Sequence, residues 1–145
     1  MASDYPKGVL TPYPDHFTTN DIQTNGATIH TRVGGNGPAV MLLHGYGLTG
    51  DSWAPLAAAL ADTHTVIVPD LRGLGLSSKP EGGYDKKTQA GDVLGVLNAL
   101  GIAQSALVSS DMGSPRRLLI CSTAAARRAG CTWRHRFPAS ARGTR

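Results

Sequence analysis

Residues 39–50 read Ala-Val-Met-Leu-Leu-His-Gly-Tyr-Gly-Leu-Thr-Gly, a run of five apolar residues that leads directly into a glycine-rich turn. A short continuous apolar run is typical of a β-strand that is buried on both faces of a parallel sheet. Thr65–Pro69 and Ser105–Val108 are two further short apolar runs, and each also leads into a loop. We therefore predict three buried parallel strands.

Two helices are predicted between these strands. The first is capped by Asp51 or Ser52 and runs to about Ala61. The second spans Asp85–Leu100, and Gly101 follows it at the position where glycine commonly ends a helix. Alternating strands and helices predict an α/β fold in which helices flank a mostly parallel sheet on both faces.

An antiparallel β-hairpin is expected ahead of the parallel strands. Phe17–Gln23 and Ala27–Val33 are the two predicted strands, and Asn25-Gly26 between them suits the left-handed positions of a type I′ turn. The predicted order is therefore a hairpin followed by β-α-β-α-β. Ligands of such sheets bind beyond the carboxyl ends of the parallel strands.

Three loops are expected at this edge of the sheet, and they are the candidate site. The third of them, Ser109–Gly113, has the pattern of a nucleophile elbow, in which a central residue is flanked by small ones. Asp111 is that central residue and is the candidate catalytic nucleophile, because a carboxylate can attack carbon and form an ester. Ser110 would be flanked by larger residues, which argues against a serine hydrolase. The alternative is that Asp111 only caps a following helix.

The first loop, His44–Gly50, is expected to supply part of an oxyanion hole. In folds with such an elbow, one backbone N–H comes from this loop and another from the residue after the nucleophile. These donors would be Tyr46 and Met112. Backbone amides suit this role because they are oriented before negative charge develops. For the His44 side chain we expect a structural role in holding the loop.

The glycines Gly45, Gly47 and Gly50 also permit a different function. Gly45-x-Gly47-x-x-Gly50 follows a buried strand and matches a dinucleotide-binding pattern, with Asp70 where an acid would bind ribose. A dinucleotide helix starting near Gly47 would carry Pro55 in its interior at a cost of ~3 kcal/mol. The dinucleotide-binding module therefore stands as an alternative. The other interpretation of the second loop, Asp70–Gly83, is a turn in which Asp70 and Arg72 hold backbone groups.

Four motifs carry a resemblance to a known family: His44-Gly45-Tyr46-Gly47, Asp70-x-Arg72-Gly73-x-Gly75-x-Ser77, Gly82-Gly83-Tyr84-Asp85 and Ser109-x-Asp111-Met112-Gly113. From about Pro14 to Gly113 the chain resembles α/β-hydrolases, and most closely bacterial epoxide hydrolases. The resemblance implies that Asp111 attacks an epoxide carbon and that a histidine-activated water then hydrolyses the ester to a diol. Carbon–halogen hydrolases of the same fold are an alternative, although they tend to have Asn and Trp where this chain has Tyr46 and Met112.

Charge divides the 145-residue chain near Gly113. Residues 1–113 contain six Lys and Arg and all ten Asp and Glu, which gives a net charge of −4. The segment from Ser114 onwards has eight Arg and no acid, which gives a charge of +8. After Asp111 there is only His135 and no acid, so no complete catalytic triad can be written. We expect a partial α/β-hydrolase domain over 1–113 and an irregular Arg-rich tail over 114–145 that is non-native or disordered. Such a chain, truncated or frameshifted, is expected to have little or no turnover.

The expected partner is a small molecule, namely an epoxide or a similar electrophile. We expect no cofactor and no metal, because Cys121, Cys131 and His135 make only a weak zinc set. No apolar run reaches the ~20 residues that cross a bilayer, and no secretory signal is visible. We therefore expect a cytoplasmic protein that does not span a membrane. A basic arm that binds RNA or anionic lipid is the alternative for the Arg-rich tail, but a disordered extension is preferred, so no nucleic-acid or membrane partner is expected. The sequence leaves the oligomeric state open.

Overall fold

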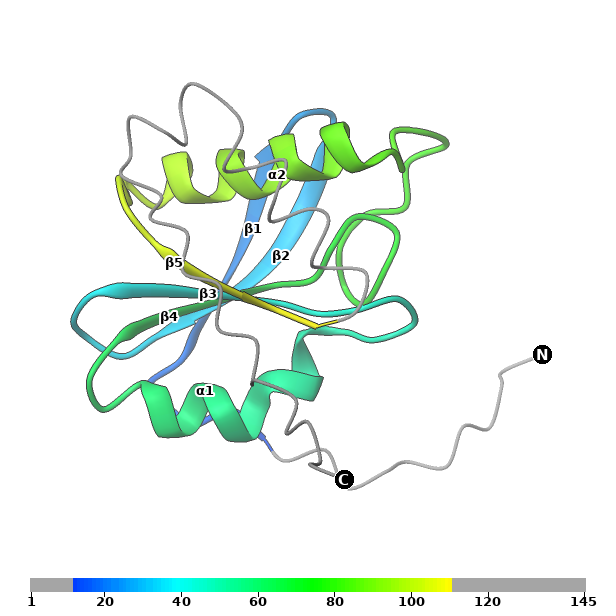
Figure 1. Cartoon of the computed structure of the whole chain (residues 1–145). Coiled ribbons are helices and arrows are strands. Elements are labelled where there is room, and N and C mark those ends of the chain that lie inside the picture. Colours follow the sequence, from blue (N-terminus) through cyan, green and yellow to red (C-terminus); the bar gives the residue numbers. More distant parts are fainter. Residues whose placement is uncertain (1–11, 111–145) are drawn as a thin grey trace, which may run out of the picture.

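The computed structural model describes residues 12–110, which form a five-stranded mixed sheet between two helices (Figure 1). The sheet order is β1-β2-β4-β3-β5. Asp111, Met112 and the tail 114–145 lie outside the described residues. The strands are β1 (Thr18–Thr24), β2 (Ala27–Gly34), β3 (Ala39–Leu43), β4 (Thr65–Pro69) and β5 (Ala106–Ser109), and the helices are the 3₁₀ turn η1 (Gly50–Trp53), α1 (Ala54–Leu60) and α2 (Lys86–Ala99).

The hairpin of β1 and β2 forms as predicted. The two strands pair antiparallel from Thr18↔Val33 to Thr24↔Ala27. Asn25 and Gly26 between them have φ values of 53° and 76°. Both residues are left-handed, as a type I′ turn requires, and this turn matches the twist of the strands it joins.

The parallel strands β4, β3 and β5 lie side by side, with β3 in the centre. β3 and β4 have the predicted bounds, whereas β5 begins and ends one residue later than predicted. β2 joins this group by antiparallel pairing with β4. Because β3, β4 and β5 run in one direction, the loops that follow them meet at a single edge of the sheet.

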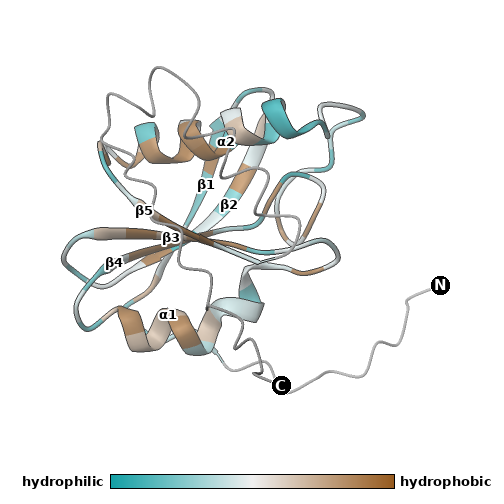
Figure 2. Ribbon diagram, viewed as in Figure 1, coloured by the Kyte–Doolittle hydropathy of each residue, from teal (hydrophilic) through white to brown (hydrophobic). Residues whose placement is uncertain are grey.

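The two faces of the sheet bury separate apolar clusters, since alternate residues of a strand point to opposite faces. Figure 2 shows that β3 and β4, at the centre of the sheet, form the most hydrophobic part of the ribbon. The cluster between the sheet and α2 includes Met41, Leu43 and Ile67 of the strands and Val93 and Val96 of the helix. The cluster between the sheet and α1 includes Val40, Leu42, Val66 and Val68 of the strands and Ala57 of the helix.

The start of the first helix differs from the prediction. Thr49, rather than Asp51 or Ser52, caps the 3₁₀ turn, because its hydroxyl accepts from the Asp51 N–H at 3.3 Å. The Asp51 carboxylate is instead held by the Arg32 guanidinium at 3.0 Å. Pro55 falls in the first turn of α1, where a missing N–H costs little.

The second helix agrees closely with the prediction. Asp85 is its N-cap and accepts from the Thr88 N–H at 2.9 Å. The hydrogen bonds from Thr88 lower the pKa of the Asp85 carboxyl. Gly101 ends the helix with a φ of 68°. Neither α1 nor α2, nor any other helical turn in residues 12–110, is long and apolar enough to span a bilayer.

Candidate active site

The first and third loops begin side by side at the carboxyl edge of the sheet. Leu43, the last residue of β3, is in register with Ser109, the last residue of β5. Beyond the strands, the Ser110 N–H donates to the Leu43 carbonyl oxygen at 3.3 Å. The pairing therefore continues up to the residue that precedes Asp111 in the sequence.

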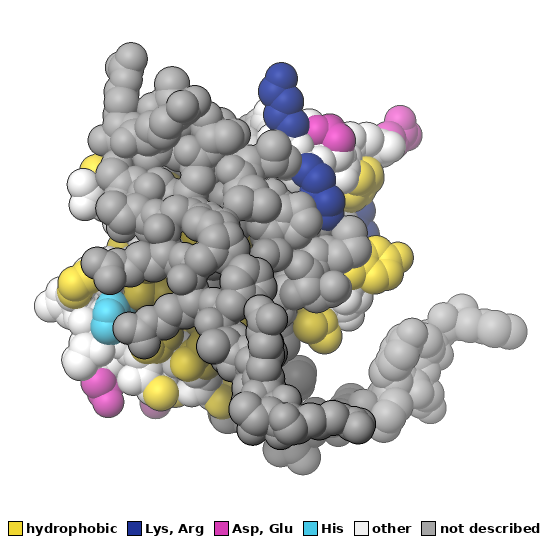
Figure 3. Space-filling model, in the orientation of Figure 1, with side chains coloured by type: hydrophobic (Ala, Val, Ile, Leu, Met, Phe, Trp, Pro, Cys, Tyr) yellow, Lys and Arg dark blue, Asp and Glu magenta, His cyan; other side chains and the backbone are white. Residues whose placement is uncertain are grey.

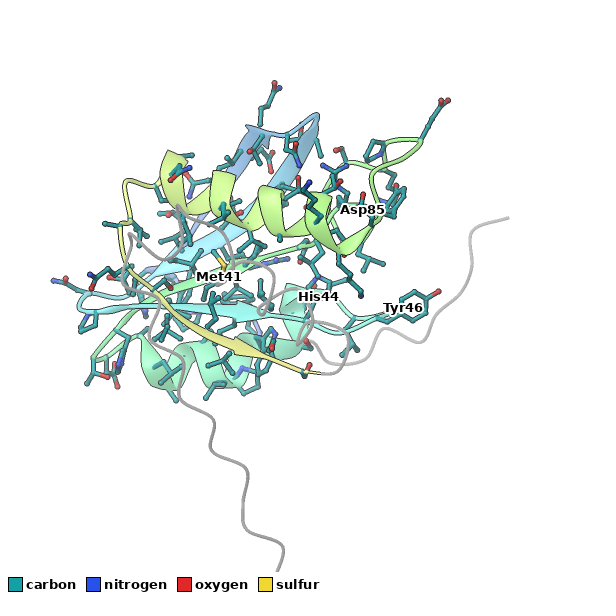
Figure 4. The ribbon with its side chains drawn as sticks, turned by 45° about the horizontal axis from the view of Figure 1, so that its top comes forward. Met41, His44, Tyr46 and Asp85 are labelled. Atoms are coloured by element: carbon teal, nitrogen blue, oxygen red, sulfur yellow. The ribbon has the colours of Figure 1, made fainter. Side chains whose placement is uncertain are left out.

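His44 is completely buried and connects the first loop to the second. Its Nε2 atom accepts from the Leu71 N–H at 2.9 Å, so the ring proton is assigned to Nδ1. Nδ1 then donates to the Gly45 carbonyl oxygen at 2.9 Å. In Figure 4 the side chain points into the body of the protein rather than into solvent. This geometry agrees with the structural role expected for His44.

Asp70 makes the reverse connection, from the second loop to the first. Its Oδ1 atom accepts from the Gly50 N–H at 2.6 Å, and its Oδ2 atom accepts from the Leu76 N–H at 3.0 Å. The Arg32 guanidinium lies 3.1 Å from Oδ1. His44 and Asp70, the first residues after β3 and β4, therefore each hold a backbone amide of the other loop.

This geometry contradicts the dinucleotide-binding alternative. The Asp70 carboxylate has no exposed surface and is occupied by protein donors, so it is not available for ribose hydroxyl groups. A 3₁₀ turn occupies Gly50–Trp53, and the α-helix begins only at Ala54, with Pro55 in its first turn. The pattern Gly45-x-Gly47-x-x-Gly50 is thus followed by a 3₁₀ turn rather than by the α-helix N-terminus that a pyrophosphate would require.

Arg72 and Asp92 form a buried ion pair beneath the second loop. The Nε and Nη2 atoms of Arg72 each donate to an Asp92 carboxylate oxygen at 2.6 Å. Nη2 also donates to the Asn25 carbonyl oxygen at 2.9 Å, which links the loop to the hairpin turn. The hydrogen bonds to Asp92 raise the pKa of Arg72, so the guanidinium stays charged. Arg72 therefore has the structural role that the sequence suggested.

Sequence reasoning missed the contribution of Arg32 and Tyr13. Arg32 lies on β2 and is almost fully buried between Asp51 and Asp70. The Tyr13 ring lies 5.3 Å from the Arg32 guanidinium carbon, and its hydroxyl donates to the Gly50 carbonyl oxygen at 2.6 Å. Burial raises the pKa of Tyr13, which keeps this hydroxyl protonated. An arginine within a predicted strand was the available signal, because buried arginines need partners.

Tyr46 lies at the tip of the first loop. Its N–H, the predicted oxyanion donor, has no hydrogen-bond acceptor within residues 12–110. Its side chain is 74% exposed and points away from the body of the protein in Figure 4. Asp111 and Met112, the predicted nucleophile and second donor, lie outside the described range, so their placement stays a prediction.

Comparisons with known proteins agree with this architecture. Residues 38–129 match the α/β-hydrolase fold family, a match that runs past Gly113. A soluble epoxide hydrolase of Corynebacterium sp. strain C12 is 40% identical over 97 residues, which are 67% of this chain and 34% of that protein. A fluoroacetate dehalogenase of a Burkholderia species is 39% identical over 102 residues, covering 67% of this chain and 34% of that protein.

The chain is also similar to solved structures of epoxide hydrolases. The crystal structure of an epoxide hydrolase from Vigna radiata superposes with a TM-score of 0.74 at 28% identity, over 79% of this chain and 37% of that one. The present chain therefore spans about a third of the length of the curated relatives that it matches.

Proposed function

The chain belongs to the α/β-hydrolase fold family, and from this premise we propose that it reacts with a small electrophile, an epoxide in the first place, through the Asp111 carboxylate. In the proposed step a carboxylate oxygen attacks an epoxide carbon and the ring carbon–oxygen bond breaks. The released oxygen takes up a proton and becomes a hydroxyl group. The product is a hydroxyalkyl ester of Asp111.

One observation carries the proposal, namely the hydrogen bond from Ser110 N–H to the Leu43 carbonyl oxygen. It joins the residue before Asp111 to the residue before the His44-Gly45-Tyr46 turn. The Tyr46 N–H, unpaired within residues 12–110, supports the role of oxyanion donor when water adds to the ester carbonyl. Met112 N–H is the second donor of the proposed site.

Hydrolysis of the ester requires a base that activates water, and the described histidines are engaged or distant. His30 lies 2.7 Å from Asp21 on the hairpin, and β4 separates this hairpin from β3. His44 is buried with both ring nitrogens in hydrogen bonds. His16 precedes β1 and His64 precedes β4, and both starts lie at the opposite edge of the sheet. Beyond the described residues the sequence adds only His135, with no acid after Asp111 to pair with it. We therefore expect the ester to accumulate when the 145-residue chain meets an epoxide.

Intact-mass measurement after incubation with styrene oxide tests this function. We expect the protein mass to rise by the full mass of the epoxide, because no atom leaves during ring opening. Asp111→Asn should give no adduct, since an amide is a poor nucleophile. Asp62→Asn, which changes an exposed acid elsewhere, should react like the parent chain. An adduct of equal yield in Asp111→Asn would refute the proposal, and steady diol release would refute accumulation of the ester.

Carbon–halogen hydrolysis is the second candidate, favoured by the 39% identity to the Burkholderia fluoroacetate dehalogenase. In that chemistry the carboxylate displaces a halide ion, so the protein mass rises by the mass of the substrate less one hydrogen halide. Fluoride release from fluoroacetate, with no adduct from styrene oxide, would favour this candidate over epoxide opening.

A further inference from the structure

A pocket of about 400 Å³ opens at the carboxyl edge of the sheet, between the first loop and the start of α2. Tyr46, Leu74 and Tyr84 form much of its wall, which is mainly apolar. Figure 3 shows hydrophobic side chains exposed beside Lys and Arg side chains along the right-hand side of the view. The pocket volume lies within the range of about 300–1,000 Å³ that is usual for small-molecule sites.

Tyr84 is a fixed wall of this pocket. Its hydroxyl donates to the Pro80 carbonyl oxygen at 2.5 Å. Its ring packs over Gly73, where an added Cβ would lie 2.5 Å from a ring carbon. Gly73 has a φ of 81°, so glycine meets both the backbone and the space requirement at this position. The ring is therefore positioned before any ligand arrives, which lowers the entropic cost of binding.

Arg72 also contributes to the wall, but its charge is already paired. The Asp92 carboxylate accepts from Nε and Nη2, the Asn25 carbonyl oxygen also accepts from Nη2, and the Gly82 carbonyl oxygen accepts from Nη1. The Arg72 side chain is only 3% exposed, so it offers a ligand neither an unpaired cation nor an open surface. Lys86 and Gln89 add polar atoms to the lining, but the wall is mainly apolar and carries two tyrosine rings, which favours an aryl group.

We propose that this Tyr46–Tyr84 pocket binds the aryl group of an aryl-substituted epoxide, an inference that rests on the proposed reaction at Asp111. The link is Tyr46, whose N–H is the proposed oxyanion donor and whose ring forms part of the pocket wall. One residue thus lies between the reacting end and the aryl end of the substrate. The substrate class is narrowed from epoxides in general to aryl epoxides.

Equilibrium binding of 1-phenylethane-1,2-diol, the unreactive product of styrene oxide, tests the pocket without requiring any reaction. Saturation-transfer NMR or calorimetry would compare it with propane-1,2-diol, which lacks the ring. We expect the phenyl diol to bind more tightly, and Tyr84→Ala to weaken it on the order of fivefold, as loss of an aromatic pair implies. Leu76→Ala is the matched control, because Leu76 is 71% exposed on the same loop and does not line the pocket.

The outcomes separate the two proposals. Equal binding of the two diols, or unchanged phenyl-diol binding in Tyr84→Ala, would overturn the pocket assignment. Phenyl-diol binding should be unchanged in Asp111→Asn, because Asp111 is not needed to hold the ring. Selective diol binding without an Asp111 adduct would mean that the reaction fails while the aryl site stands. An adduct that forms equally well in Tyr84→Ala and the parent chain would support the reaction and remove the aryl site.

Discussion

The loops that follow β3 and β4 are both rich in glycine, yet they are anchored very differently. The loop after β4, Asp70–Gly83, is held by the buried side chains of Asp70, Arg72 and Ser77. The loop after β3 is held near its base by His44, but its tip exposes Tyr46 and Leu48. The hydrogen bond from Leu48 N–H to the Gly45 carbonyl oxygen, at 3.4 Å, spans this tip.

The glycines serve different purposes in the anchored parts of the loops and at the exposed tip of the shorter loop. A Cβ at Gly75 would collide with the Asp70 carboxylate, and one at Gly83 would collide with the Arg72 guanidinium. A Cβ at Gly47 would meet nothing within 4 Å, so this residue is needed only for its φ of 70°. Gly50, at the end of the shorter loop, resembles the two glycines of the longer loop, because a Cβ there would lie 2.8 Å from the Arg32 guanidinium and 2.9 Å from the Asp70 carboxylate. The anchored parts of both loops therefore form the scaffold, and the tip of the shorter loop presents the Tyr46 amide.

Removal of Asp92 is expected to have the largest effect on stability, because Asp92 anchors the longer loop through Arg72. Asp92→Ala leaves the Arg72 guanidinium buried without its partner, and we expect a loss of about 3–5 kcal/mol in unfolding free energy. Chemical denaturation monitored by circular dichroism would measure it. Asp62→Ala, at an exposed acid, should change stability by less than about 0.5 kcal/mol. The double variant Arg72→Met/Asp92→Leu should recover much of the loss, and failure of Asp92→Ala to destabilise would show that the ion pair does not hold the loop.

An intermediate effect is expected at the base of the first loop. His44→Leu removes the acceptor of the buried Leu71 N–H, which should cost about 1–3 kcal/mol. His44→Gln supplies an amide oxygen in the same region and should restore part of the stability. If Asp111 reacts as proposed, the rate of adduct formation should follow the same order, measured by mass spectrometry over time. Equal stability of His44→Leu and the parent chain would contradict the proposed role of this histidine.

The smallest effect on stability is expected at the tip. Tyr46→Ala should change the unfolding free energy by less than about 0.5 kcal/mol, because the side chain is 74% exposed. The same variant should weaken phenyl-diol binding, since the ring forms part of the pocket wall. A large loss of stability in Tyr46→Ala would show that the two loops are anchored alike after all.

The fold was largely predictable because its signals are local. The apolar run Ala39–Leu43 and the Asn25-Gly26 turn each act through neighbouring residues, and both appear as predicted. The alternation of strands and helices then fixed the parallel arrangement of β3, β4 and β5. The predicted cap of the first helix was wrong because the Asp51 carboxylate forms an ion pair with Arg32, a residue 19 positions earlier in the sequence.

The site was less predictable because its contacts join residues that are far apart in the sequence. The carboxylate of Asp70 suits either a ribose or a backbone amide, and only the fold shows that Gly50 and Arg32 occupy it. The aryl pocket depends on Gly73 and Tyr84 meeting across a loop, which no local pattern encodes. Asp111 and Met112 remain predictions from the elbow pattern and from the family resemblance.

The crossed attachments of His44 to Leu71 and of Asp70 to Gly50 constrain how this region can be redesigned or can diverge. A segment grafted from a relative in place of either loop would lose one of the two attachments unless its counterpart came with it. An insertion that displaced Leu71 would break the hydrogen bond to His44, which holds the loop that carries Tyr46. The two segments should therefore be exchanged, and inherited, as one unit.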